Sequence, residues 1–319
     1  MKRHGMIFGL LVLGLMAAAP GMAADYDLVI NNGRVMDPET KFDAVANVGI
    51  KDGSIVAITE EKITGKKTID ATGHVVAPGF IDIHAHGQNI GDYRMQAMQG
   101  VTTMLELESG VLPIGEWYDK QAKKKLPVNY GASAAWTFAR IATFTGKPPS
   151  SEPAYFQDAQ GRTDWKMNLA TPEQQSQILK LVEQGLDQGA LGIGINAGYA
   201  PGYGREEYFA LAELAAKRGV ATFTHVRYAS NVEPQSSFEA VEELISLSAI
   251  TGAHMHLCHI NSSSLKDIDA TLGLVDDAFE RGINISVGAY PWGAASTRLG
   301  ERLALGLTLS HEDQHNILC

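Results

Sequence analysis

The chain has 319 residues, of which 45% are hydrophobic and 19% charged, which is ordinary globular composition with room for one large and one smaller domain. The formal net charge of −10 argues against a nucleic-acid partner. Cys258 lies inside an apolar segment and Cys319 is the last residue, so the two cysteines are expected to be free thiols.

Residues 1–24 have the pattern of a secretory signal. A basic start precedes an apolar run over residues 6–19, and the small residues after it suit cleavage after Ala23 or Ala24. The run is too short for a comfortable transmembrane helix, although an uncleaved anchor is the alternative. We therefore expect a periplasmic or secreted protein with no stable membrane insertion after cleavage.

Residues 25–77 predict a small β-rich domain. Strands are expected at residues 27–30, 44–50 and 54–58, with turn signals at residues 31–33 and 51–53. Such a segment is too small to bury much core alone, so it should pack on the domain that comes after it in the chain.

Residues 78–319 predict strands that alternate with helices, which indicates a parallel sheet with the helices outside. Seven strands are expected, ending at or near residues 86, 108, 136, 195, 227, 261 and 290. Helices are expected at residues 91–100, 205–218, 237–249 and 265–281, with another opening at Thr171-Pro172. Residues 145–169 are expected to form a loop that acts as a rim lid. The glycines of residues 190–195 suggest close approach of a ligand or a helix.

The first strand of this domain closes on a His-x-His motif. Because side chains alternate along a strand, His84 and His86 should point the same way. Two neutral imidazoles held so can chelate one divalent metal, with bonds of roughly 2.0–2.1 Å for zinc. The Pro-Gly before the strand and the Gly after it are typical of a barrel strand that ends at a catalytic rim.

His225 and His259 end two further strands. Each one alone would be interpreted as a core histidine, but four histidines at the ends of three strands favour a site for one or two metal ions. Ligands at the carboxyl ends of strands also favour a (β/α)-barrel over a doubly wound sheet. His254 and His256 have the opposite parity to His259, so they are interpreted as structural residues against the helices.

Glu106 and Glu108 end the second strand. The pair is either solvated or binds something, because two carboxylates on an apolar strand are otherwise costly. A carboxylate between two metals is one such role, and we favour Glu108 for it. Strict alternation places Leu105, Leu107 and Ser109 on one face, so a carboxylate role requires the strand end to twist or bulge.

At this point the chain resembles the amidohydrolase superfamily, and within it the D-aminoacylase (N-acyl-D-amino-acid deacylase) branch. The matching segments, in the family's order, are residues 27–38, 69–86, 100–103, 189–192, 224–227, 258–260 and 289–292. The resemblance implies an α/β fold, a (β/α)8 TIM-type barrel with a small N-terminal β-sandwich segment. Only seven strands are found, so we expect a barrel truncated before strand eight.

The resemblance also implies metal ligands. His84 and His86 would hold one ion and His225 and His259 the other, with Zn²⁺ as the expected metal. A cysteine that bridges the metals in the family falls at the serine after Glu108, so Glu108 is expected to take over.

Substrate contacts are implied by the same resemblance. Tyr290 and Ser296 match positions that grip the substrate carboxylate, and a lysine that helps to bind substrate falls at Asn261. Arg227 is a candidate for a second carboxylate, with a salt bridge at the rim as the alternative. The family's catalytic aspartate at the end of strand eight has no counterpart.

The function that the resemblance implies is metal-dependent hydrolysis of the amide bond of an N-acyl-D-amino acid, a small-molecule substrate, with N-acyl-D-glutamate as a candidate. A cyclic-amide hydrolase or an isoaspartyl dipeptidase is the alternative, although those relatives usually carry a bridging lysine that residues 192–196 lack. A catalytically inactive metal- or ligand-binding fragment is the alternative of another class. Without the strand-eight aspartate, we expect the 319-residue chain alone to be poorly soluble and to show negligible activity.

Overall fold

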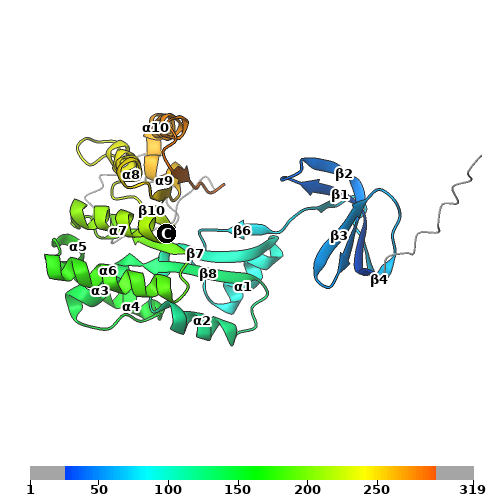
Figure 1. Cartoon of the computed structure of the whole chain (residues 1–319), viewed down its shortest axis with the longest axis horizontal. Helices are drawn as coiled ribbons and strands as arrows, with labels where there is room; N and C mark the ends of the chain where they lie inside the picture. The colour runs from blue at the N-terminus through cyan, green and yellow to red at the C-terminus, as the bar shows by residue number, and fades with distance from the viewer. Residues whose placement is uncertain (1–25, 292–319) are drawn as a thin grey trace, which may run out of the picture. The chain divides into compact units, whose positions relative to one another are not determined.

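The computed structural model describes residues 26–291, and these form two compact units that divide between Pro78 and Gly79 (Figure 1). The expected Ser296 contact and the signal at residues 1–24 lie outside the described residues. No helix within residues 26–291 combines the length and the apolar character needed to cross a membrane.

The first unit is a single five-stranded sheet. Its strands are β1 (Tyr26–Asp37), β2 (Phe42–Lys51), β3 (Ser54–Thr59), β4 (Gly65–Asp70) and β5 (Val75–Val76). They lie in the order β3-β2-β1-β4, and β5 also pairs with β1. Residues 26–78 form no second sheet, so the expected sandwich is represented here by one layer.

The two turn predictions for this unit had different outcomes. The turn at residues 51–53 is present, and Asp52 and Gly53 both have positive φ, as a tight hairpin turn requires. The turn predicted at residues 31–33 is wrong. There β1 runs straight on, and a register shift between Ile30 and Gly33 absorbs the extra residues as a bulge.

The second unit contains a seven-stranded, all-parallel sheet. The strands are β6 (Phe80–Asp82), β7 (Val101–Val111), β8 (Asn129–Ala135), β9 (Gly192–Asn196), β10 (Ala221–His225), β11 (His254–Leu257) and β12 (Ile285–Val287). Their spatial order follows the sequence from β6 to β12, which confirms the predicted strand–helix alternation. Among the described residues, β6 and β12 are the two ends of this sheet.

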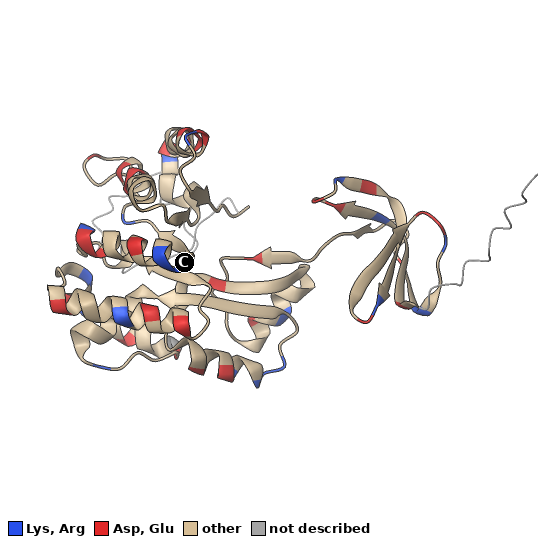
Figure 2. Cartoon of the chain, viewed as in Figure 1, with Lys and Arg blue, Asp and Glu red and all other residues tan. Residues whose placement is uncertain are grey.

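Helices flank the sheet (Figure 1). The longer ones are α1 (Ile90–Met98), α2 (Ile114–Ala122), α3 (Trp136–Thr145), α6 (Pro172–Asp187), α7 (Arg205–Arg218), α8 (Ser237–Thr251) and α10 (Ile268–Glu280). The predicted capping box at Thr171 opens α6, and Gly219 in the left-handed conformation ends α7. Basic and acidic positions are interspersed along the helices and turns (Figure 2).

The segment over residues 145–169 is more ordered than predicted. It contains two short helices, α4 (Pro153–Ala159) and α5 (Asp164–Met167), instead of a structureless lid. Trp165 is fully buried and joins the main hydrophobic core with Trp136. The apolar surface that these side chains bury is what fixes the segment against the helices.

Candidate metal centre

Four histidines from three strands meet on the inner side of the curled sheet. His84 and His86 follow β6, His225 is the last residue of β10, and His259 lies two residues beyond β11. In a flat sheet β6 and β11 would lie about 24 Å apart at the usual strand spacing. The rings of His84 and His259 are nevertheless only 5.3 Å apart, centroid to centroid, so the sheet must curl strongly.

The first histidine pair owes its direction to local structure. Strand β6 ends at Asp82, earlier than predicted, and the Asp82 carboxylate accepts the His84 backbone N–H at 2.9 Å. The Ala85 N–H donates to the Leu105 carbonyl, and the Ala85 methyl is buried in a small core cluster. Alternation therefore leaves His84 and His86 on the opposite, open side.

Glu108 stands between the two histidine pairs. Its side chain is buried, with 3% of the residue exposed. Oε2 lies 3.2 Å from His84 Nε2 and 3.1 Å from His86 Nε2. Oε1 lies 3.0 Å from His225 Nδ1 and 2.7 Å from His259 Nε2. Each carboxylate oxygen thus faces one pair of imidazole nitrogens.

These donor sets fit two divalent ions. The facing nitrogens are 3.0 Å apart in the His84–His86 pair and 2.9 Å apart in the His225–His259 pair. Two nitrogen ligands of one tetrahedral zinc ion lie about 3.3 Å apart, given bonds of about 2.0–2.1 Å. The first ion would be held by His84, His86 and Oε2 of Glu108, and the second by the other pair and Oε1.

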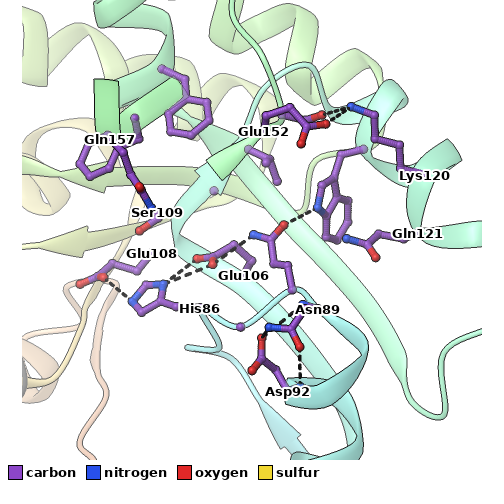
Figure 3. Close-up of a pocket in the computed structure, with 18 of the residues that line it drawn as sticks. His86, Asn89, Asp92, Glu106, Glu108, Ser109, Lys120, Gln121, Glu152 and Gln157 are labelled. Carbon is purple, nitrogen blue, oxygen red and sulfur yellow. Dashed lines mark hydrogen bonds and ion pairs between the residues drawn. The ribbon is translucent and has the colours of Figure 1, made fainter. Parts of the chain in front are cut away.

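Glu106 supports the first pair from behind. His86 Nδ1 lies 3.0 and 3.2 Å from the two Glu106 oxygens, so an Nδ1–H there would leave the Nε2 lone pair facing Glu108. Gln88 donates to Glu106 at 3.4 Å and accepts from the Trp117 indole N–H at 2.6 Å. Figure 3 shows this chain of contacts beside Glu108. Both glutamates therefore serve the same site in different ways.

The end of β7 is irregular. Regular alternation would not direct Glu108 toward the histidines, so an irregularity was expected there. Glu106 pairs with Ala132 of β8, but the next paired residue of β7 is Val111, which pairs with Ala134. Gly110, inside the unpaired stretch, has φ of +65°. The bulge turns Glu108 toward the histidines.

His259 reaches the centre because the chain leaves the strand before it. Strand β11 ends at Leu257, and His259 has φ of +41° at the start of α9 (Ile260–Ser264). Its Nδ1 lies 2.9 Å from the Ser263 hydroxyl, which orients the ring and directs Nε2 toward Glu108.

The interpretation of His254 and His256 as residues packed against the helices is wrong. The His256 ring lies 5.5 Å from that of Phe223, its register partner on β10. Thr224, on the other face of β10, bonds to Tyr208 of the outer helix α7. His254 and His256 therefore face inward, where both bond to the Ser286 hydroxyl. The left-handed residue at position 259 breaks the parity on which the prediction rested.

The imidazoles of the centre differ in protonation. Burial lowers the pKa of His225, and the attraction of Glu108 does not reverse it, so this ring is ready to act as a neutral ligand. Burial acts against protonation of His86 too, but Glu106 and Glu108 outweigh it and raise the pKa of His86 to about 11. Burial alone would raise the pKa of Glu108, but His225, His259 and His84 bring it well below its usual range.

Glycines of β9 and the turn after it make room for the centre. A Cβ at Gly194 would lie 2.5 Å from the Ser133 hydroxyl of β8 and 2.6 Å from the Glu108 carbonyl oxygen of β7, so the neighbouring strands approach this glycine closely. A Cβ at Gly198 would lie 2.8 Å from His225 Cδ2. Substitution at either position would displace a residue of the metal centre.

A cavity of about 760 Å³ opens beside the first histidine pair (Figure 3). Glu108, His86 and Glu106 form one end of it. Aromatic walls come from Trp117, Phe138, Phe156 and Tyr199, and Lys120 and Glu152 stand at the other end, 2.7 Å apart. The volume is that of a site for a small-molecule ligand.

The comparison with known protein families identifies the chain. The model of the Amidohydrolase family matches residues 67–308, which is most of the sequence. The chain belongs to the amidohydrolase family. The strand order and the inward histidines described above are therefore those of a family member.

Individual relatives of this amidohydrolase differ in activity. N-acyl-D-glutamate deacylase of Alcaligenes xylosoxydans xylosoxydans is 28% identical over 301 residues, which cover 87% of this chain and 59% of that protein. Allantoinase of Enterococcus faecalis is 27% identical over 253 residues, which cover 73% of this chain and 54% of that protein. The chain thus spans little more than half the length of these relatives.

A solved structure shares the fold. It is N-acyl-D-glutamate deacylase from Bordetella bronchiseptica, complexed with zinc and a phosphonate inhibitor that mimics the tetrahedral intermediate of the reaction. The match has a TM-score of 0.69 at 22% identity and covers 84% of this chain and 59% of that one.

The residues expected to contact substrate in this amidohydrolase lie in different surroundings. Asn261, on α9, donates to the Tyr290 carbonyl at 3.1 Å, so these two are brought together. Arg227 is buried and forms a bidentate salt bridge with Glu243 of α8. Its Nε donates to Oε2 at 3.2 Å and its Nη2 donates to Oε1 at 2.9 Å. It also donates to the carbonyls of Pro201 and Tyr203. This geometry is the salt-bridge alternative for Arg227.

Three supporting residues were missed by sequence reasoning. Gln88 continues the alternation of His84 and His86 by one more step, and that period of two was the available signal. Trp117 and Ser263 approach the site from helices, and no local pattern connects them with it.

Proposed function

We propose that this amidohydrolase is a metal-dependent hydrolase that cleaves the amide bond of an N-acyl-D-amino acid, giving a carboxylate and the free D-amino acid. The observation that carries the proposal is the buried Glu108 carboxylate, with one histidine pair at each oxygen, at the end of an open cavity. The similarity to N-acyl-D-glutamate deacylase over 87% of the chain supports the substrate class, with N-acyl-D-glutamate as the first candidate.

Zn²⁺ is the proposed metal. Imidazole nitrogen and carboxylate oxygen suit zinc, and the Bordetella relative was solved with zinc. When bound, the metal supplies a water of lowered pKa and polarises the acyl carbonyl. The chain's own contribution is to hold the four imidazoles around the Glu108 carboxylate, and to fix the His86 tautomer through Glu106.

The cavity would take the substrate. Its aromatic walls suit an acyl chain, and the end formed by His86 and Glu108 would receive the amide. Asn261 and Tyr290 are the described candidates for contacts to the amino-acid part. Within residues 26–291 the carboxylates nearest the centre, Glu106 and Glu108, are both engaged by histidines. The proposal therefore gives neither of these two carboxylates the role of proton acceptor.

Hydrolysis of a cyclic amide is the second candidate. The similarity to allantoinase over 253 residues favours it. Against it, β9 contains no lysine between Gly192 and Asn196, where cyclic-amide hydrolases of the superfamily usually carry a bridging one.

Binding and turnover on one substrate panel would separate the candidates. We would load the purified protein with zinc and measure binding of N-acetyl-D-glutamate, N-acetyl-L-glutamate, other N-acetyl-D-amino acids, allantoin and a hydantoin by calorimetry. Hydrolysis would be followed in parallel by amine release. The proposal expects metal-dependent binding that favours the D-enantiomers. Preference for the cyclic amides, or equal binding of D and L forms, would overturn it.

We also propose that the protein is exported and acts on small molecules in the periplasm or outside the cell. The basis is the signal pattern of residues 1–24. Expression of the full chain followed by intact-mass measurement should show cleavage after Ala23 or Ala24 in the exported fraction. A product that keeps its first 24 residues would contradict this proposal.

A further inference from the structure

Cys258 lies next to the metal centre, between β11 and His259. It is 2% exposed and forms no disulfide. It has the same parity as His256, which faces inward. The Cys258 Sγ, an imidazole nitrogen of His84 and a carboxylate oxygen of Glu108 all lie within 4.8 Å of one another.

Two polar side chains lie near this thiol. A buried cysteine that only fills space packs among apolar groups and is inert. Here the side chain instead has a buried carboxylate and a histidine as close neighbours, and these are two of the ligands already assigned to the first ion.

We propose that Cys258 is the fourth protein ligand of the first metal ion, beside His84, His86 and Glu108. The thiol would bind as a thiolate, releasing its proton to solvent as the metal–sulfur bond forms. The proposal rests on the metal centre of the proposed function and is independent of the substrate.

The distances allow this with a small adjustment. A sulfur and a nitrogen bound to one tetrahedral zinc lie about 3.6 Å apart, given bonds of about 2.3 and 2.0–2.1 Å. The atoms here lie within 4.8 Å, so binding would draw Sγ inward by about an ångström at most. Rotation within the side chain and small shifts of the turn at His259 suffice for such a movement.

The consequence is that the two ions have unequal roles. Four protein ligands close the first ion, as in structural zinc sites, whereas three ligands leave the second ion with an open position, as in catalytic ones. His225, His259 and Oε1 of Glu108 would therefore hold the ion that keeps a position free for water. Neighbouring residues, Cys258 and His259, would serve different ions because the left-handed backbone at His259 turns its side chain away.

Cobalt substitution tests the assignment without any need for turnover. The protein loaded with two equivalents of Co²⁺ should show a near-ultraviolet thiolate-to-cobalt charge-transfer band. The band should persist in Cys319→Ser, the matched control at the only other cysteine of the chain, and disappear in Cys258→Ser. Cys258→Ser should also weaken the binding of one ion by more than about tenfold, while the other ion is unaffected.

X-ray absorption on the zinc-loaded Cys319→Ser protein tests the same assignment with Cys258 in place. Its result therefore holds even if the Cys258→Ser variant fails to fold. The proposal expects a sulfur shell at about 2.3 Å that corresponds to one sulfur for every two zinc ions. A shell of nitrogen and oxygen alone would overturn it. A shell of nitrogen and oxygen alone in a protein that still binds N-acetyl-D-glutamate refutes this inference only. A sulfur shell in a protein that does not recognise D-amino acids refutes the proposed substrate only.

Discussion

Replacement of Glu108 by glutamine should weaken both metal sites at once. The carboxylate lies 2.7–3.2 Å from four imidazole nitrogens, two at each oxygen. Glutamine has nearly the same shape but keeps only one ligating oxygen, and its NH₂ group cannot bind a cation. One site therefore loses a ligand, and both lose the negative charge that offsets the ions.

The expected size of the effect depends on that geometry. Loss of a supporting contact behind a ligand costs about 10–100-fold in metal affinity, and loss of the ligand itself should cost more. We therefore expect Glu108→Gln to bind at most one ion per chain, with affinity lowered by more than about 100-fold. Glu106→Gln alters a side chain that contacts His86 alone among the four histidines, so it should weaken the first ion by about 10–100-fold and spare the second.

Metal content after gel filtration and competition with a chelating dye would measure both variants. Glu152→Gln is a matched control, because Glu152 lines the same cavity but pairs with Lys120 away from the histidines. Two tightly bound ions in Glu108→Gln, with loss in Glu106→Gln, would refute the bridging role and transfer it to Glu106.

Three further outcomes are expected. Gly198→Ala should push the His225 ring aside and lower affinity for the second ion by at least about tenfold, with the first ion as internal control in a metal titration. Without metal the pKa of His86 is raised to about 11, so the ring is protonated at pH 7. Metal binding should therefore release a proton, and the apparent metal affinity should rise with pH up to about 11. Calorimetry in buffers of different ionisation enthalpy would detect the proton, and identical heats would contradict the assignment. Ile178→Ala, at a fully buried position of α6, should cost about 2–5 kcal/mol in urea unfolding, whereas Ile250→Ala, 70% exposed on α8, should change stability by less than about 0.5 kcal/mol.

The sequence predicted those parts of the fold that local rules determine. Helix α7 has the bounds expected from its pattern and its terminal Gly219, and α6 begins at the predicted Thr171 cap. The four histidines could be selected because each lies at or just beyond a strand end, where a parallel sheet presents its side chains at one rim.

The rest depends on local breaks in regular structure and on contacts between distant segments. The bulge of β7 and the positive φ of His259 both reverse the direction that simple alternation gives. The positive φ of His259 leaves no recognisable mark in the sequence, because Cys258-His259 contains no glycine, whereas the bulge of β7 is marked only by Gly110. Arg227 could have bound substrate or paired at the rim, and only the fold shows that Glu243 of α8 lies beside it. Supporting residues such as Trp117 are found only once the helices are placed.

The long sequence separation within the metal centre has a consequence for folding. Glu108 and His259 lie 151 residues apart, and the histidine after β6 meets the one after β11 across four intervening strands. Bound ions would therefore act as cross-links that close loops of this length. Because loop closure becomes more costly in entropy as the loop lengthens, such a cross-link restricts the denatured ensemble far more than a short-range one does. Ions bound there would therefore hold the sheet in its curled form, whatever their part in the chemistry.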